Sequence, residues 1–306
     1  EMARRLGLDA KTLTNICGSL LEAGLIRRSG EVLKGRGRPQ EELSIRPEAA
    51  FAIGLDIGAR QVSCVVTDLA GSVRYEKRTE SSHEGKRQEV LDAVDALIRA
   101  AFASLSPAER KRIEGIGCAV PGILNREEGT VLHAANIPAL SGFSMCSTLS
   151  ELYRVPVNLE EASRAMALSE IWFTDCRRDN FICIDAGFGI GMGIVFSGRL
   201  YRGNSELSGE IGHTVVDPRG SRCSCGKRGC LETVASGRAL TDLAASMDFS
   251  PYGVHGRDAK ALAEAAAKGC AEAVHALERA GRRIGVAVAN TINLFDPGVI
   301  ILNGGL

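Results

Sequence analysis

The chain has 306 residues, with 37 Lys and Arg against 37 Asp and Glu, so its formal net charge is zero. That length predicts two or three domains, and the charge excludes a protein that binds nucleic acid with its whole surface, though not a local basic patch. Aromatic residues make up only 5% of the chain, too few for a platform that stacks single-stranded bases. No apolar run approaches the roughly 20 residues that span a bilayer, and no signal-peptide pattern opens the chain. Together with ten irregularly spaced cysteines, these features predict a soluble, cytoplasmic protein in a reducing compartment, with no membrane partner.

The first 30 residues have the pattern of two short helices separated by a glycine. Met2, Ala3 and Leu6 form the first helix, which breaks at Gly7, and Asp9 is placed to cap the second. This is the helix-turn-helix plan, in which the second helix enters the major groove of DNA. Its expected buried stripe consists of Leu13, Ile16, Cys17, Leu20 and Leu21. Polar side chains suited to phosphates and base edges follow Asp9, and the candidate DNA contacts are Lys11, Thr12, Thr14 and Asn15.

A hairpin and a basic stretch come next. Residues 25–33 predict the hairpin of a winged helix, and Arg36-Gly37-Arg38-Pro39 follows it. Such a slim basic strand fits the narrow minor groove of A·T-rich DNA, which attracts guanidinium groups. A solvated basic linker is the alternative, but the position directly after a wing favours DNA contacts by Arg36 and Arg38. We therefore expect a winged helix-turn-helix domain over residues 1–46, incomplete at its N-terminus.

From residue 47 onward, strand-like and helical patterns alternate, which predicts an α/β domain. Residues 51–68 and 181–198 share one plan, an apolar strand, a turn with Asp and Gly, and a second strand. The repeat predicts two α/β lobes that face a cleft, although two unrelated hairpins remain an alternative. Apolar spacing predicts helices over 91–105 and 259–267, a long helix between Gly269 and Asp296, and a buried strand over 299–302. Because the chain ends on a turn, we expect this domain, over residues 47–306, to be incomplete at its C-terminus.

Four possible metal ligands lie within one short segment. His213, Cys223, Cys225 and Cys230 occur within 18 residues, and the intervening glycines permit a tight loop. Thiolates and imidazole in this number suit a tetrahedral Zn²⁺ site with no open position, so the metal is expected to be structural. Three free thiols are the alternative, but clustered exposed thiols would be prone to oxidation.

Taken together, these features resemble the ROK family of sugar kinases and sugar-responsive transcriptional repressors over nearly the whole chain. The most specific match is Glu210-Ile211-Gly212-His213 followed by the Cys-x-Cys-Gly-x-x-Gly-Cys-Leu-Glu run that ends at Glu232, and it also supports the zinc assignment. A winged helix followed by Gly-Arg-Gly-Arg-Pro is similar to the repressor branch. The resemblance implies an actin-like, two-lobed fold, with sugar in the cleft and ATP beside it. The sugar contacts that it implies are Asn136, Glu210, His213 and Glu232.

Departures from the kinase pattern separate the two branches of the family. The resemblance implies an Asn-Asp pair in the kinases, with the Asp as general base; this chain has Glu161-Ala162, and a methyl group accepts no proton. The phosphate loops also lack their Thr hydroxyls, because Ala59-Arg60 and Phe188 stand in their places. Arg60 is open to two interpretations, an anion contact or an exposed strand-end charge. These losses predict that the protein does not phosphorylate sugars.

We therefore predict a repressor, not an enzyme, that binds a double-stranded DNA operator as a homodimer or higher homo-oligomer. Its predicted effector is a sugar or a sugar phosphate. One alternative is an ATP-dependent sugar kinase of the same family, and another is a regulator that answers a non-sugar signal. Ala162 removes one expected sugar partner, so an altered or vestigial sugar pocket is a further alternative. For Glu232, the alternative is that it only orients the zinc loop.

Overall fold

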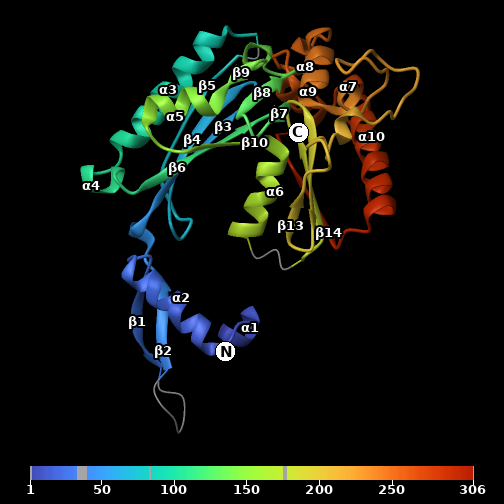
Figure 1. The fold of residues 1–306 in the computed structure, drawn as a ribbon. Helices are drawn as coiled ribbons and strands as arrows, with labels where there is room; N and C mark the ends of the chain where they lie inside the picture. Colours follow the sequence, from blue (N-terminus) through green and yellow to red (C-terminus); the bar gives the residue numbers. More distant parts are fainter. Residues whose placement is uncertain (1, 33–39, 83, 175–177, 306) are drawn as a thin grey trace.

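The structure, a computed structural model, describes residues 2–32, 40–82, 84–174 and 178–305. It begins with α1 (Met2–Leu6) and α2 (Ala10–Glu22), followed by the antiparallel strands β1 (Ile26–Val32) and β2 (Gln40–Ile45). As predicted, Asp9 caps α2, because its carboxylate accepts the backbone N–H groups of Lys11 and Thr12 at 2.9 Å. These elements form a small unit at one end of the molecule, shown in blue in Figure 1.

Two predictions for this unit were wrong in detail. The hairpin extends beyond residues 25–33, because the strand that pairs with β1 is β2, which begins at Gln40. Arg36 and Arg38 lie outside the described residues. The predicted buried stripe of α2 is only half-buried, and Ile16 is 42% exposed. Two short helices and one two-stranded hairpin provide too few neighbours to cover that stripe fully.

The first lobe is built on a five-stranded sheet with the strand order β10-β6-β3-β4-β5. Its strands are β3 (Phe51–Ile57), β4 (Gln61–Asp68), β5 (Val73–Glu80), β6 (Ile113–Val120) and β10 (Val157–Glu161). Alternate residues of β3 are buried, as expected when one face of a strand meets a core. The helices α3 (Arg87–Ala103) and α5 (Met145–Tyr153) cover that face. The lobe also holds α4 (Pro107–Arg110) and a small sheet of β7 (Ile123–Asn125), β8 (Thr130–His133) and β9 (Phe143–Ser144).

The second lobe is built on a four-stranded sheet with the order β13-β12-β11-β14. Its strands are β11 (Phe181–Ala186), β12 (Ile190–Phe196), β13 (Arg199–Tyr201) and β14 (Val299–Asn303). The helix α6 (Ala162–Phe173) packs on one face through Ala167. A second core joins the other face to α8 (Gly237–Ala245), α9 (Ala259–Ala267) and α10 (Ala271–Phe295), with the short α7 (Glu232–Ala235) beside them. Figure 1 shows α6 between the two sheets.

The internal repeat predicted from the sequence is present in both lobes. The antiparallel pair β3–β4 occupies the first lobe, and the antiparallel pair β11–β12 occupies the second. The predicted helices also form, and α10 ends at Phe295, before Asp296, whose backbone is left-handed with φ of +42°. None of the described helices is long and apolar enough to cross a membrane.

The strand predicted over residues 299–302 forms as β14, but it is not buried. Val299 is 36% and Leu302 is 60% exposed. Among the described strands, β14 pairs only with β11, so it lies at the edge of its sheet. An apolar run alone does not distinguish an edge strand from a central one, which explains the error.

Candidate functional site

A cavity of about 440 Å³ lies between the lobes. The first lobe contributes Asn136, from the loop after β8, and the second contributes Glu210, His213 and Glu232. These are the four residues for which the family resemblance implied sugar contacts, and the fold brings all of them to one cavity. The start of α6 completes the wall with Ala162 and Ser163.

Asn136 and Glu232 approach each other over the turn of the second hairpin. The Ile190 backbone N–H donates to Oε2 of Glu232 at 3.0 Å. A Cβ atom at Gly189 would lie 2.6 Å from Asn136 Nδ2 and 2.9 Å from Glu232 Oε2, closer than side chains tolerate. Gly189 therefore lets an amide and a carboxylate from different lobes meet beside the cavity.

The four predicted metal ligands also form one cluster. The donor atoms of His213, Cys223, Cys225 and Cys230 all lie within 4.8 Å of one another. Cys223 Sγ is 3.4 Å from His213 Nδ1, and Cys225 Sγ is 3.6 Å from Cys230 Sγ. Tetrahedral zinc–thiolate bonds of about 2.3 Å place two sulfur ligands about 3.8 Å apart, so this donor set fits zinc.

The loop that holds the cluster is folded by its own backbone and by α10. The amides of Val216 and Asp217 both donate to the carbonyl of Gly229, at 2.8 Å and 3.1 Å. Arg283 of α10 donates to the carbonyl of Val216 at 2.8 Å and to Asp217 Oδ2 at 3.4 Å. These contacts hold the loop of the cluster against α10 of the second lobe without a metal ion.

His213 connects this cluster to the cavity. Its Nδ1 faces Cys223, while its Nε2 lies 3.8 Å from Glu210 Oε2. A histidine that ligates a metal through one nitrogen is oriented by the partner of the other. The imidazole therefore links the loop that holds the cluster to the carboxylate of Glu210 in the cavity wall.

The kinase-specific positions differ as the sequence predicted. Ala162 is the first residue of α6, and it presents a methyl group to the cavity. Glu161, one position earlier, caps α6 with its carboxylate. Its oxygens accept the backbone N–H groups of Ser163 at 3.1 Å and Arg164 at 3.0 Å.

Arg60 and Phe188 meet across the interlobe gap. The Arg60 guanidinium lies 5.3 Å from the centre of the Phe188 ring, within reach of a cation–π interaction. Its Nη2 also donates to Thr241 Oγ1 on α8 at 2.6 Å. Arg60 is exposed, yet it is engaged with the second lobe, so neither interpretation of this residue from the sequence described it fully.

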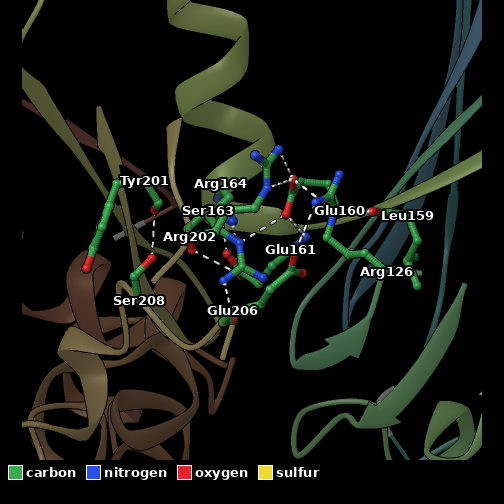
Figure 2. Close-up of polar contacts among 10 residues, drawn as sticks. All are labelled: Arg126, Leu159, Glu160, Glu161, Ser163, Arg164, Tyr201, Arg202, Glu206 and Ser208. Carbon is green, nitrogen blue, oxygen red and sulfur yellow. Dashed lines mark hydrogen bonds and ion pairs between the residues drawn. The ribbon is translucent and has the colours of Figure 1, made fainter. Parts of the chain in front are cut away.

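Sequence reasoning missed an ion-pair network beside the cavity (Figure 2). Glu160 at its centre receives Arg164 Nε at 3.0 Å, Arg202 Nη2 at 2.8 Å and Arg126 Nε at 3.4 Å. Burial alone would raise the pKa of Glu160, but the bond from Arg202, the Glu161 amide and the other charges outweigh it, so its pKa is lowered.

The network spans both lobes. Arg126 Nη1 lies 3.2 Å from Glu206 Oε1, and Arg164 Nη1 donates to the carbonyl of Glu206 at 2.8 Å. Glu160 lies in β10, Arg164 lies in α6, and Glu206 follows β13. The only local signal in the sequence was the spacing of four between Glu160 and Arg164.

The predicted DNA contacts that the structure describes lie on the first turns of α2. Lys11, Thr12, Thr14 and Asn15 all face solvent. The Thr12 hydroxyl donates to Asp9 and the Thr14 hydroxyl to the carbonyl of Ala10, so both hydroxyls have local partners. Lys11 and Asn15 have the least engaged side chains of this group.

The fold and site define a two-lobed, actin-like α/β protein with a Cys₃His loop beside its interlobe cavity. Residues 52–306 match the ROK family, and the chain belongs to that family. The xylose repressor of Bacillus subtilis (strain 168) is 28% identical over 310 residues, which cover 100% of this chain and 77% of that protein. The N-acetylglucosamine repressor of Escherichia coli O157:H7 is 29% identical over 315 residues, with 99% and 75% covered.

Solved structures of both branches resemble the chain. A ROK family transcriptional regulator, described as a homolog of the E. coli MLC protein, aligns with a TM-score of 0.78 at 30% identity and covers 98% of this chain and 77% of its own. A ROK family glucokinase from Streptomyces griseus, in complex with glucose and AMPPNP, aligns with a TM-score of 0.73 at 29% identity, with 84% and 83% covered. The actin-like fold that the resemblance implied is confirmed.

Proposed function

We propose that this protein is a sugar-responsive transcriptional repressor and that its kinase-like domain senses sugar without phosphorylating it. The observation that carries the proposal is the interlobe cavity, which gathers Asn136, Glu210, His213 and Glu232 but has Ala162 at the position of the kinase base. The similarity to proteins named xylose repressor and N-acetylglucosamine repressor supports it.

In this proposal, residues 1–46 form a winged helix-turn-helix that binds an operator, and residues 47–306 form the effector domain. The helix order and hairpin of the described N-terminal residues support that assignment. One such module reads only a few base pairs, so we propose that two copies of the chain bind a palindrome together. The effector domain has no strong charge bias, and we propose that it provides the dimer interface.

Zinc, in this proposal, is a structural cofactor held by His213, Cys223, Cys225 and Cys230. Bound there, the ion supplies a rigid cross-link of the loop and performs no step of catalysis. The contact between His213 and Glu210 then makes the metal loop part of the sugar-binding wall.

We expect no sugar kinase activity. Loss of a general base costs about 10²–10⁴ in rate, and the side chains of Arg60 and Phe188 compound that loss by occupying the phosphate-loop positions. Coupled measurement of ADP release with glucose, xylose and N-acetylglucosamine checks this. Turnover of about one per second with any of these sugars would refute the proposal.

The variant Ala162→Asp separates the two causes of inactivity. It restores a carboxylate at the start of α6 but leaves Arg60 against Phe188 and Thr241. We therefore expect it to remain inactive as well. Phosphorylation by this single variant would show that the phosphate loops are competent and that only the base is missing.

For DNA binding, replacing both Arg36 and Arg38 with Ala is expected to weaken binding and to reduce its salt dependence. Guanidinium groups in a minor groove displace counterions, and each lost contact lowers the salt slope by about one. Lys11→Ala and Asn15→Ala should instead change the preference at individual bases. Fluorescence anisotropy over a salt series measures these effects, with Arg99→Ala on the exposed side of α3 as control. Unchanged affinity and slope in the double variant would leave residues 36–39 as a linker.

A further inference from the structure

The charges that line the sugar cavity have one predominant sign. Four carboxylates face it, those of Glu161, Asp185, Glu210 and Glu232. Lys227 is the only lysine or arginine among the described lining residues. His213 is neutral when it ligates a metal. The cavity wall therefore carries an excess of negative charge.

One position in this wall that would attract an anion, the N-terminus of α6, is already filled. The N-terminus of α6, a helix of 12 residues, lies in the cavity wall, and such a terminus can bind phosphate or carboxylate. Here the carboxylate of Glu161 accepts the amides of Ser163 and Arg164. The chain thus supplies its own anion where a phosphate group of a ligand would otherwise be stabilised.

The nearby guanidinium groups are committed elsewhere. Arg126, Arg164 and Arg202 all bind Glu160, and none of them lines the sugar cavity. Arg126 and Arg202 instead border a separate groove beneath the first sheet. Arg60 is held by Thr241 and Phe188. Among the described lining residues, a phosphorylated ligand would meet four carboxylates, the single lysine Lys227 and the imidazoles of His133 and His213.

Building on the proposed function, we propose that the effector is an unphosphorylated sugar, that the cavity rejects the phosphorylated form, and that Glu161 contributes most to this discrimination. Uncharged hydroxyl groups can donate hydrogen bonds to all four carboxylates, whereas a phosphate group has no proton donors to match them and is repelled. Burial raises the pKa of both Glu161 and Asp185, because negative charge is poorly solvated in this part of the wall. A phosphate group placed there would be disfavoured for the same reason.

Titration calorimetry with matched ligands tests this inference. The probes are glucose against glucose 6-phosphate, N-acetylglucosamine against its 6-phosphate, and a panel of free pentoses and hexoses. We expect a free sugar to bind and its phosphate to bind at least about a hundredfold more weakly. Glu161→Gln keeps an oxygen to cap α6 but removes the charge, and it should narrow that ratio by about tenfold.

Two further variants complete the experiment. Glu210→Gln removes a half-exposed carboxylate without touching the α6 cap, so it should also narrow the ratio even if Glu161→Gln destabilises the fold. Glu264→Gln, on the exposed side of α9, serves as the matched control and should leave the ratio unchanged. An unchanged ratio in both pocket variants would overturn the electrostatic explanation.

Two outcomes distinguish failure of this inference from failure of the proposed function. Tighter binding of a phosphorylated sugar than of its free form would overturn this inference and leave the proposed sugar-responsive function in place. If no free or phosphorylated sugar of the panel binds, both the inference and the proposed sugar response are overturned.

Discussion

Cys230→Ser is expected to abolish zinc binding and to destabilise the second lobe strongly. Cys230 is fully buried, and its Sγ lies 3.6 Å from that of Cys225 within the four-donor cluster. A hydroxyl is a much poorer zinc ligand than a thiolate, and zinc binding free energy is folding free energy in closed sites of this type. Metal analysis should fall from about one zinc per chain toward zero, and the thermal midpoint should drop by about 10 °C or more.

The loss should also extend to sugar binding, because His213 would no longer be fixed beside Glu210. Cys146→Ser, a half-buried thiol of the first lobe, is the matched control and should retain both metal and sugar. A Cys223→Ser, Cys225→Ser double variant covers the case in which Cys230→Ser does not fold. Full zinc content in that double variant would refute the assignment of the ligands.

Glu160→Ala is expected to lower the free energy of unfolding by about 3–5 kcal/mol, because it leaves a buried guanidinium unpaired. The Arg164 side chain is only 1% exposed, and Glu160 is its one carboxylate partner among the described residues. Glu76→Ala is the matched control, because it breaks the exposed pair with Arg78 and should cost less than about 1 kcal/mol. Urea denaturation of the three proteins measures the difference. Equal losses in the two variants would show that the network contributes no more than a surface ion pair.

The same network predicts a dependence on pH. The folded pKa of Glu160 is lowered, so its contribution to stability is complete above the unfolded pKa, about 4.3. That contribution should disappear as the pH falls through the folded value. In Glu160→Gln this component of acid destabilisation should be absent, and the denaturation midpoints of the two proteins should converge at low pH.

Local features were predictable from the sequence. The zinc loop could be identified because its donors are close in the chain and thiolates at that spacing have few other uses. The two hairpins were recognisable because each pairs an apolar strand with a glycine turn, and Asp9 was recognisable as a helix cap. In each case the residues that interact are near neighbours in sequence.

Features that depend on distant partners were not predictable. Arg60 and Thr241 are 181 positions apart, and two partners of Glu160, Arg126 and Arg202, come from segments far from it in the sequence. The exposure of β14 depends on its place at the edge of the sheet, which no pattern within residues 299–303 encodes. The cavity residues Asn136 and Glu232 were found only through the family resemblance, because the packing of the two lobes brings them together.

Release of DNA by sugar tests the central claim most directly. DNA fragments that the protein selects from a random pool would be labelled, and binding would be followed by fluorescence anisotropy while a free sugar identified by calorimetry is added. The account predicts that the selected fragments share an inverted repeat and that the sugar lowers the bound fraction at concentrations near its dissociation constant. Selection of no common sequence, or complexes unchanged by every sugar that binds, would contradict it.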